Sequence, residues 1–118
     1  MNSARIELQV EQDADVTVIS VRGPRVPADL GDSFEESVVQ TIGQLENPKV
    51  LLDFEGVEFL SSAILGKLIK LNGAVMDRNG QLKISSLTGK IAEVFKITNL
   101  DRLFSIHKTR DRALRDFQ

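Results

Sequence analysis

Segments with strand character alternate along this chain with longer segments that have helical spacing. Residues 5–11, RIELQVE, carry an apolar side chain at every second position, which is typical of a β-strand with one face in water. A later segment instead has apolar residues at every third or fourth position, as on one face of an α-helix: Leu30, Phe34, Val38, Ile42 and Leu45. Strands that alternate with helices imply parallel pairing through crossover helices, so the pattern predicts an α/β fold.

The same reading along the chain predicts five strands and about four helices. The first two strands are joined by a short polar turn, so they should form an antiparallel hairpin at the edge of a mixed, mostly parallel sheet. A length of 118 residues is that of one domain, and there is no repeat or linker, so we expect a single domain over residues 1–118. The expected strands cover residues 5–11, 16–21, 49–54, 81–85 and 103–106, and helices are expected between residues 30 and 45, from Ser62, from Leu87 to about Asn99, and after Thr109.

Composition excludes several classes of protein. The chain has no cysteine, which excludes disulfides and thiolate chemistry, and its net charge of −2 gives no sign of nucleic-acid binding. The N-terminus does not resemble a signal peptide and no apolar run is long enough to span a bilayer, so we expect a cytoplasmic protein that does not insert into membranes. Basic residues near the end of the chain are interleaved with acidic ones, which predicts a solvated helix face: Lys108, Arg110, Arg112 and Arg115.

Catalytic and metal-binding patterns are absent from the sequence. His107 is the only histidine, at the end of the last predicted strand, and no G-x-S-x-G motif surrounds the serines that precede the second helix. Phosphate-binding loops, dinucleotide-binding glycines and calcium-binding loops are missing as well. We therefore expect no enzyme activity, no cofactor and no metal site.

Two adjacent serines, Ser61 and Ser62, stand where the third strand has ended and the second helix begins. One serine is enough to cap a helix, because its oxygen can accept one of the unpaired amide hydrogens of the first turn. The second would remain exposed at the rim where open α/β sheets tend to place functional sites. The nearby carboxylates Asp53, Glu55 and Glu58 are either solvated charges at the edge of the sheet or an acidic surround for Ser62.

The chain resembles the STAS domain family of bacterial anti-sigma factor antagonists. The resemblance covers nearly the whole chain and rests on two segments, VLLDFEGVEFLSSAILG at residues 50–66 and VFKITNLDRLFSI at residues 94–106. In the family, an apolar strand that ends in Asp is followed by a Gly-Val turn and then by a D-S-S/T-G-L-G motif that opens a helix. The positions that fit this pattern are Asp53, Gly56, Val57, Ser62, Leu65 and Gly66.

The resemblance implies a protein that acts by partner switching. An anti-sigma factor that is also a serine kinase would bind the unphosphorylated chain and release it after phosphorylating Ser62, and a PP2C-type phosphatase would reset it. Ser61 would be a helix cap or a secondary phosphorylation site. The partner would contact the loop Gly23–Ala28. It would also contact five residues around the start of the second helix: Gly56, Glu58, Leu60, Ser61 and Ile64. A weak homodimer is left open.

Three departures from the family pattern support an alternative function. Ser61 stands where the family has Asp, Ile64 stands where it has Gly, and Gly23-Pro24-Arg25-Val26 lacks the acidic residue expected in that loop. The alternative is a STAS scaffold that is not phosphorylated, or an accessory subunit of a transport system.

Overall fold

The computed structural model describes residues 7–22, 25–26, 31–43 and 45–117. Seven strands and five helices lie in these ranges. The strands are β1 (Glu7–Asp13), β2 (Val16–Arg22), β3 (Arg25–Val26), β4 (Lys49–Asp53), β5 (Phe59–Leu60), β6 (Gln81–Ser85) and β7 (Ser105–His107). The helices are α1 (Gly31–Ile42), α2 (Ser62–Asp77), α3 (Gly89–Ile97), α4 (Leu100–Leu103) and α5 (Arg110–Asp116).

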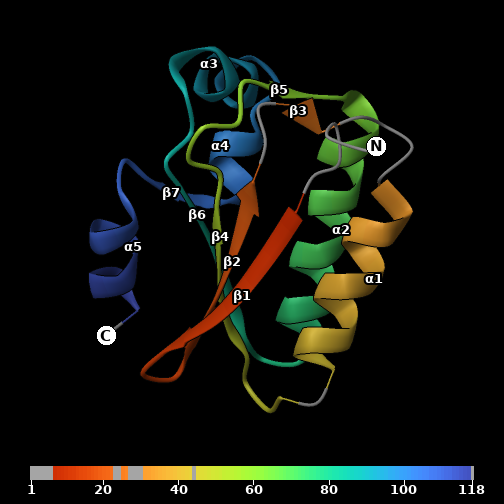
Figure 1. The fold of residues 1–118 in the computed structure, drawn as a ribbon, viewed down its shortest axis with the longest axis vertical. Helices are drawn as coiled ribbons and strands as arrows, with labels where there is room; N and C mark the ends of the chain where they lie inside the picture. The colour runs from red at the N-terminus through yellow and green to blue at the C-terminus, as the bar shows by residue number, and fades with distance from the viewer. Residues whose placement is uncertain (1–6, 23–24, 27–30, 44, 118) are drawn as a thin grey trace.

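The main sheet has five strands in the order β1-β2-β4-β6-β7. The hairpin of β1 and β2 is antiparallel, and its seven residue pairs run from Glu7–Arg22 to Asp13–Val16. The pairs β2–β4, β4–β6 and β6–β7 are all parallel. Because parallel strands point the same way, β4, β6 and β7 end at one edge of the sheet, where the connections to α2, α3 and α5 begin (Figure 1).

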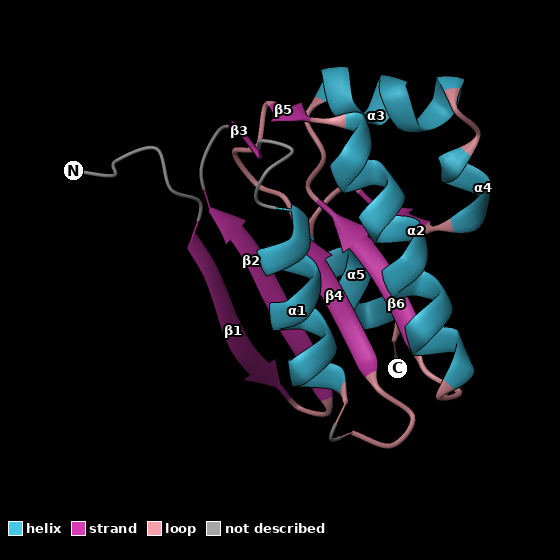
Figure 2. Cartoon of the chain, turned by 90° about the vertical axis from the view of Figure 1, so that its right-hand side faces the viewer, coloured by secondary structure: helices cyan, strands magenta, loops and turns pink. Residues whose placement is uncertain are grey.

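Helices cover both faces of the sheet, and each face has its own apolar cluster. On one face, α1, α2 and α3 pack against the larger cluster, in which α2 supplies Ile64, Leu68, Leu71 and Val75 (Figure 2). On the other face, α5 packs Ala113 and Phe117 against Val16, Val18 and Leu51. Residues 50–53 of β4 lie between these two clusters and are all buried, as the continuous apolar run predicts for a central strand.

The predicted α/β fold, the mixed sheet and the N-terminal hairpin are confirmed. The details differ at the first strand and where elements are very short. The strand predicted at residues 5–11 is β1 at Glu7–Asp13, and residues 5 and 6 lie outside the described residues. The two-residue strands β3 and β5 form a separate small sheet, and α4 is a fifth helix of one turn. Since α4 takes up Leu103, the last strand begins at Ser105 and extends to His107, rather than covering residues 103–106.

Gly80 joins α2 to β6 in close contact with the segment that precedes β4. A Cβ atom at this position would lie 2.3 Å from the carbonyl oxygen of Pro48. That oxygen also accepts a hydrogen bond of 2.8 Å from the amide of Gln81, so it is held in place. Only glycine allows the two segments to approach this closely.

We therefore expect Gly80→Ala to destabilise the fold by about 1–3 kcal/mol, the usual range for a group forced into a packed site. The matched control is Gly73→Ala in the middle of α2, where an added Cβ would meet no atom within 4 Å. This control should stabilise the fold by about 1 kcal/mol, because alanine is the better helix former. Urea denaturation of both variants measures the effects, and equal effects would contradict the assignment of this contact.

Candidate functional site

A tight turn takes the chain out of the buried strand β4. The amide of Val57 donates a hydrogen bond of 3.0 Å to the carbonyl oxygen of Phe54. Gly56 lies in this turn with φ of 85°, a conformation that is strained for any residue with a side chain. Phe54 and Val57 are buried, whereas Glu55, Gly56 and Glu58 are exposed. The turn therefore places Gly56 and Glu58 at the surface, as expected.

The small second sheet joins two segments that the sequence analysis assigned to one surface. Arg25 pairs with Phe59 and Val26 pairs with Leu60, in parallel. The strand β3 is the described part of the predicted contact loop Gly23–Ala28, and the other residues of that loop lie outside the described residues. The pairing brings this loop to the residues immediately before Ser61.

Ser61 and Ser62 have different structural roles. Ser61 is the N-cap of α2 in an extended conformation, with φ of −75° and ψ of 161°. Its Oγ accepts a hydrogen bond of 3.3 Å from the amide of Ile64. Ser62 is the first residue of the 16-residue helix and its side chain is exposed. The fold thus uses the hydroxyl of Ser61 and leaves that of Ser62 at the surface.

Ile64 does not lie at the surface where the sequence analysis placed it. Its exposed fraction is 0%, and it packs in the larger apolar cluster. Leu60 is partly buried against the same cluster. The prediction that Ile64 contacts a partner is therefore wrong for its side chain. The physical reason is that Ile64 belongs to the same helical stripe as Leu68 and Leu71, which faces the sheet.

An apolar hollow of about 170 Å³ lies beside the start of α2, between β5 and α3. Phe59, Leu65 and Val94 contribute apolar side chains to it, with Glu58 and Lys90 among its other lining residues. Phe59 is 47% exposed, which is unusual for a large aromatic side chain. The sequence analysis did not identify this hollow. The available signal was the apolar pair Phe59-Leu60 between the turn and the serines.

Asp53 is not a solvated charge at the rim of the sheet. It is 5% exposed, and its Oδ1 accepts a hydrogen bond of 3.1 Å from the hydroxyl of Ser85 on the neighbouring strand β6. Glu55 and Glu58 are exposed, as expected. The three carboxylates therefore have different roles. That of Asp53 is buried and links β4 to β6, whereas those of Glu55 and Glu58 lie in water.

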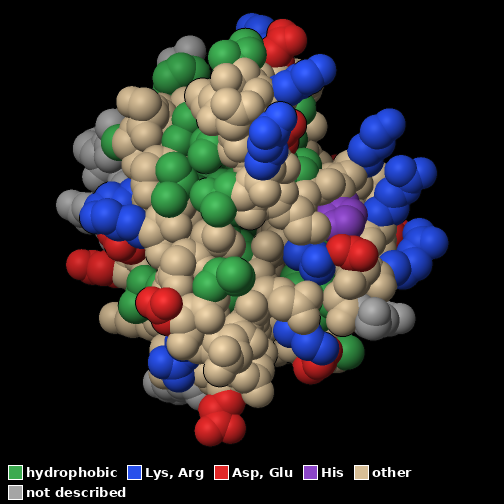
Figure 3. All heavy atoms as spheres, turned by 180° about the vertical axis from the view of Figure 1, so that it is seen from behind, with side chains coloured by type: hydrophobic (Ala, Val, Ile, Leu, Met, Phe, Trp, Pro, Cys, Tyr) green, Lys and Arg blue, Asp and Glu red, His purple; other side chains and the backbone are tan. Residues whose placement is uncertain are grey.

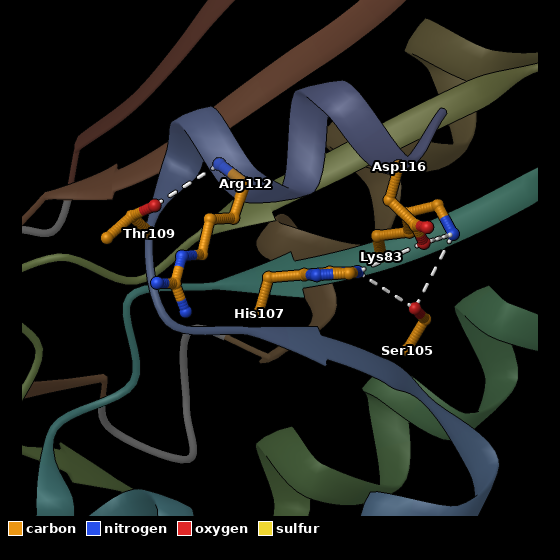
Figure 4. Close-up of polar contacts among 6 residues, drawn as sticks. All are labelled: Lys83, Ser105, His107, Thr109, Arg112 and Asp116. Atoms are coloured by element: carbon orange, nitrogen blue, oxygen red, sulfur yellow. Dashed lines mark hydrogen bonds and ion pairs between the residues drawn. The ribbon is translucent and has the colours of Figure 1, made fainter. Parts of the chain in front are cut away.

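A polar cluster lies under α5, on the opposite face of the sheet (Figure 4). The Nε2 atom of His107 lies 3.0 Å from the Oγ of Ser105 and 3.3 Å from the Oδ2 of Asp116. The same Oδ2 accepts a hydrogen bond of 2.7 Å from the ammonium group of Lys83. A hydrolytic triad needs the serine and the acid on different nitrogens of the histidine ring, whereas both lie at Nε2 here. The cluster is therefore a structural link between α5 and the sheet.

The model of the STAS domain matches residues 7–113 of this chain. The chain belongs to the STAS domain family. A Thermotoga neapolitana protein, provisionally named an anti-sigma factor antagonist, is 33% identical over 70 residues, which cover 59% of this chain and 62% of that protein. Proteins of this family are typically non-enzymatic.

Solved STAS structures share the fold. An anti-sigma factor antagonist from Mycobacterium paratuberculosis has a TM-score of 0.84 at 23% identity, covering 97% of this chain and 95% of that one. A STAS domain protein from Planctomyces limnophilus has a TM-score of 0.82 at 23% identity, covering 94% and 97%.

The C-terminal helix α5 of this STAS domain and the residue Lys108, which precedes its N-cap, present basic side chains to water. Lys108, Arg112 and Arg115 are exposed, and Arg110 donates a hydrogen bond of 3.1 Å to Glu11. Figure 3 shows Lys and Arg side chains gathered beside His107 on this side of the molecule. Since acidic side chains lie among them, this is the solvated helix face that the charge pattern predicted. Within the described residues, no helix is long and apolar enough to cross a membrane.

The division of roles between the two serines predicts different effects on stability. Ser61→Ala removes the capping oxygen and should destabilise the fold by about 1 kcal/mol, the usual value for a lost N-cap. Ser62→Ala removes only an exposed hydroxyl from the first helical position and should change the free energy of unfolding by less than about 0.5 kcal/mol. Urea denaturation tests this, and an equal loss in both variants would contradict it.

The cluster under α5 predicts how stability depends on pH. The hydrogen bond and positive charge of Lys83 hold the pKa of Asp116 below its ordinary value of 3.8, and His107 acts in the same direction. A lowered pKa means that the stabilisation by Asp116 is complete above the unfolded pKa and is lost as the pH falls through the lower folded pKa. Asp116→Asn should therefore lower the urea midpoint at pH 7 but not well below pH 3.8.

The control for this experiment is the same substitution in a Lys83→Met background. Without the ammonium group, Asp116→Asn should have a much smaller effect at neutral pH. An undiminished effect would show that Asp116 stabilises the protein through other contacts.

Proposed function

We propose that this STAS domain is an anti-sigma factor antagonist that acts by partner switching, with Ser62 as the phosphorylated residue. The observation that carries the proposal is the separation of the two serines at the start of α2. Ser61 caps the helix, so the exposed hydroxyl of Ser62 is available to a kinase without loss of the cap. The anti-sigma factor antagonists among the relatives support the general role.

A phosphate on Ser62 is compatible with the fold. It would carry a charge of about −1.5 to −2 at neutral pH. The first turn of a helix has unpaired amide groups and the positive end of the helix dipole, which both favour an anion. Because the side chain of Ser62 is exposed, the added group needs no rearrangement of the core. Phosphorylation would therefore change the surface of the protein and leave the fold intact.

The proposed partner surface surrounds Ser62. It comprises the exposed Gly56 and Glu58, the partly buried Leu60, the capping Ser61, and the apolar hollow beside Phe59. A partner side chain that enters the hollow would bury Phe59 and gain apolar contact, which is the usual basis of an interface hot spot. The buried Ile64 supports this surface from below and is not part of it.

A phosphate would weaken such a complex strongly. Docking over Ser62 would force the partner to desolvate a dianion without a matching positive charge, which costs several kcal/mol. A loss of about 4 kcal/mol already corresponds to a thousandfold loss of affinity. We propose that the partner is an anti-sigma factor that is itself the serine kinase, and that a PP2C-type phosphatase in the cytoplasm reverses the modification.

The binding part of the proposal predicts that Ser62→Asp weakens partner binding, while Ser62→Ala binds like the wild type. The carboxylate provides about half of the phosphate charge, so we expect a loss of about tenfold or more in affinity. Isothermal titration calorimetry with the anti-sigma factor kinase of the same organism measures this affinity for each variant. Equal affinity of Ser62→Asp and wild type, with both variants folded, would contradict the switch.

Phosphorylation itself is tested by incubating the protein with that kinase and ATP, followed by intact mass measurement. We expect one added phosphate in the wild type and in Ser61→Ala, and none in Ser62→Ala. Modification of Ser62→Ala would move the site to Ser61. A complete absence of phosphate in the wild type would favour the alternative function of a scaffold or transport accessory domain, which the replacement of the family Asp by Ser61 also favours.

A further inference from the structure

The apolar hollow beside Phe59 has walls from three elements that meet near the start of α2. Phe59 comes from β5, Leu65 from α2 and Val94 from α3 (Figure 2). Ile91 also lines the hollow and belongs to the larger apolar cluster, and Leu60 lines it and packs against that cluster. Because the core holds this inner lining in place, the hollow is a fixed feature of the surface.

The size of the hollow favours a single side chain over a small molecule as its occupant. Its volume is about 170 Å³. Pockets for small-molecule ligands usually have volumes of about 300–1,000 Å³. The side chains that anchor protein interfaces, by contrast, are single large groups that fill well-packed pockets. The expected occupant is therefore a leucine, methionine or phenylalanine side chain of another protein.

The apolar lining continues outside the hollow along α3. Val94 is 40% exposed. Ile97 follows three positions later, and hence on the same side of the helix, and is 73% exposed. An amphipathic helix of another protein could cover Phe59, Val94 and Ile97 together. It would place one apolar side chain in the hollow and another, one turn away, against Ile97.

Two opposite charges flank the hollow and indicate how such a helix would be oriented. Glu58 precedes β5, and Lys90 lies in the first turn of α3. Both residues are exposed, and neither forms an ion pair with any other residue that the structure describes. Charges across an interface are usually complementary, which selects the correct partner and fixes its orientation. A partner should therefore place a basic residue beside Glu58 and an acidic residue beside Lys90.

We propose that the hollow is the anchor site for an amphipathic helix of the anti-sigma factor. The helix inserts one large apolar side chain into the hollow and packs a second against Ile97. It carries a basic residue that faces Glu58 and an acidic residue that faces Lys90. The existence of this partner rests on the proposed function, and the hollow adds the chemistry by which the partner is recognised.

The anchor site and Ser62 are separate parts of one surface. Ser62 is not among the residues that line the hollow, so a phosphate on its hydroxyl would leave the hollow open. The hollow supplies affinity through buried apolar area, whereas Ser62 supplies the charge that is regulated. Variants of the hollow should therefore weaken partner binding without changing which serine the kinase modifies.

The first test measures binding of hollow variants to the anti-sigma factor kinase of the same organism by isothermal titration calorimetry. Phe59→Ala should weaken binding by about thirtyfold, the level of an interface hot spot. Val94→Ala removes less apolar surface and should weaken binding by roughly five- to tenfold. Since alanine is favoured at an exposed helix position, lost affinity in Val94→Ala cannot be attributed to misfolding.

The matched control is Val39→Ala on α1. Val39 is 42% exposed, which is close to the value for Val94, and it does not line the hollow. This variant should bind the kinase like the wild type. Urea denaturation of Phe59→Ala, Val94→Ala and Val39→Ala shows whether each variant is folded under the conditions of the titration.

The second test exchanges the two charges that flank the hollow. The double variant Glu58→Lys with Lys90→Glu keeps the net charge of −2, so the overall electrostatic attraction is unchanged. It brings like charges together at both positions and should weaken binding by about tenfold or more. The neutral double variant Glu58→Gln with Lys90→Gln has the same net charge and adds no repulsion, so it should lose no more than about fivefold.

The possible results distinguish a wrong anchor site from a wrong function. Wild-type affinity in Phe59→Ala and Val94→Ala, or in the charge-exchanged variant, would overturn the anchor site, while weaker binding of Ser62→Asp would still support the switch. An equal loss in Val39→Ala and Val94→Ala would place the contact elsewhere and would also overturn the anchor site. A wild-type protein that does not bind the kinase at all would overturn both proposals.

Discussion

The burial of β4 on both faces is the constraint on which the rest of the structure depends. Val50 and Leu52 point into the larger cluster, and Leu51 points into the smaller one. A strand with no wet face needs a helical layer on each side and paired neighbours along both edges. The parallel connections to β2 and β6 follow from that need, and so does the position of α5 on the opposite side from α1 and α2.

The same constraint determines where the candidate site lies. The chain must leave β4 at its carboxyl end and cross to the layer of α2, and the turn at Gly56 begins that crossing. The residues between the turn and the helix therefore lie at the rim of the sheet, where backbone groups at the start of α2 remain unpaired within the helix. Ser61 pairs one of these groups, and the neighbouring Ser62 is left to water for a purely geometric reason.

Much of this could be predicted from the sequence, because the long elements have clear periodicity. The alternation in residues 5–11 identified a strand, although Val10 on its apolar side is 50% exposed. The helical stripe from Ile64 to Val75 identified a helix with the correct buried face. That stripe already assigned Ile64 to the core, so placing it on the partner surface disregarded a signal that was present. Strands of two residues, such as β3 and β5, have no periodicity to detect, and only their pairing in space reveals them.

Residues that interact across the sheet were the least predictable. Lys83 lies in an alternating strand where a lysine suggests a wet face, yet it is 8% exposed because α5 covers it. Its charge is compensated by Asp116, 33 residues away along the chain, and by the ring of Phe117 at 5.1 Å. The hollow beside Phe59 likewise needs side chains from β5, α2 and α3. No local pattern contains such information, because the partners are brought together only by the topology of the fold.

The helix α2 combines a buried face that holds the domain together with exposed groups on which the fold does not rely. Its core residues are fully packed, whereas Ser62, Ile69 and Met76 lie in water. A change of charge or of partner at these groups therefore leaves the packing free energy of the core almost unchanged. Regulation by a modified side chain requires this separation, since a phosphate that unfolded the domain would remove the binding surface instead of switching it. The helix N-terminus meets this requirement of the proposed switch because the cap is supplied by Ser61, while the hydroxyl of Ser62 is exposed.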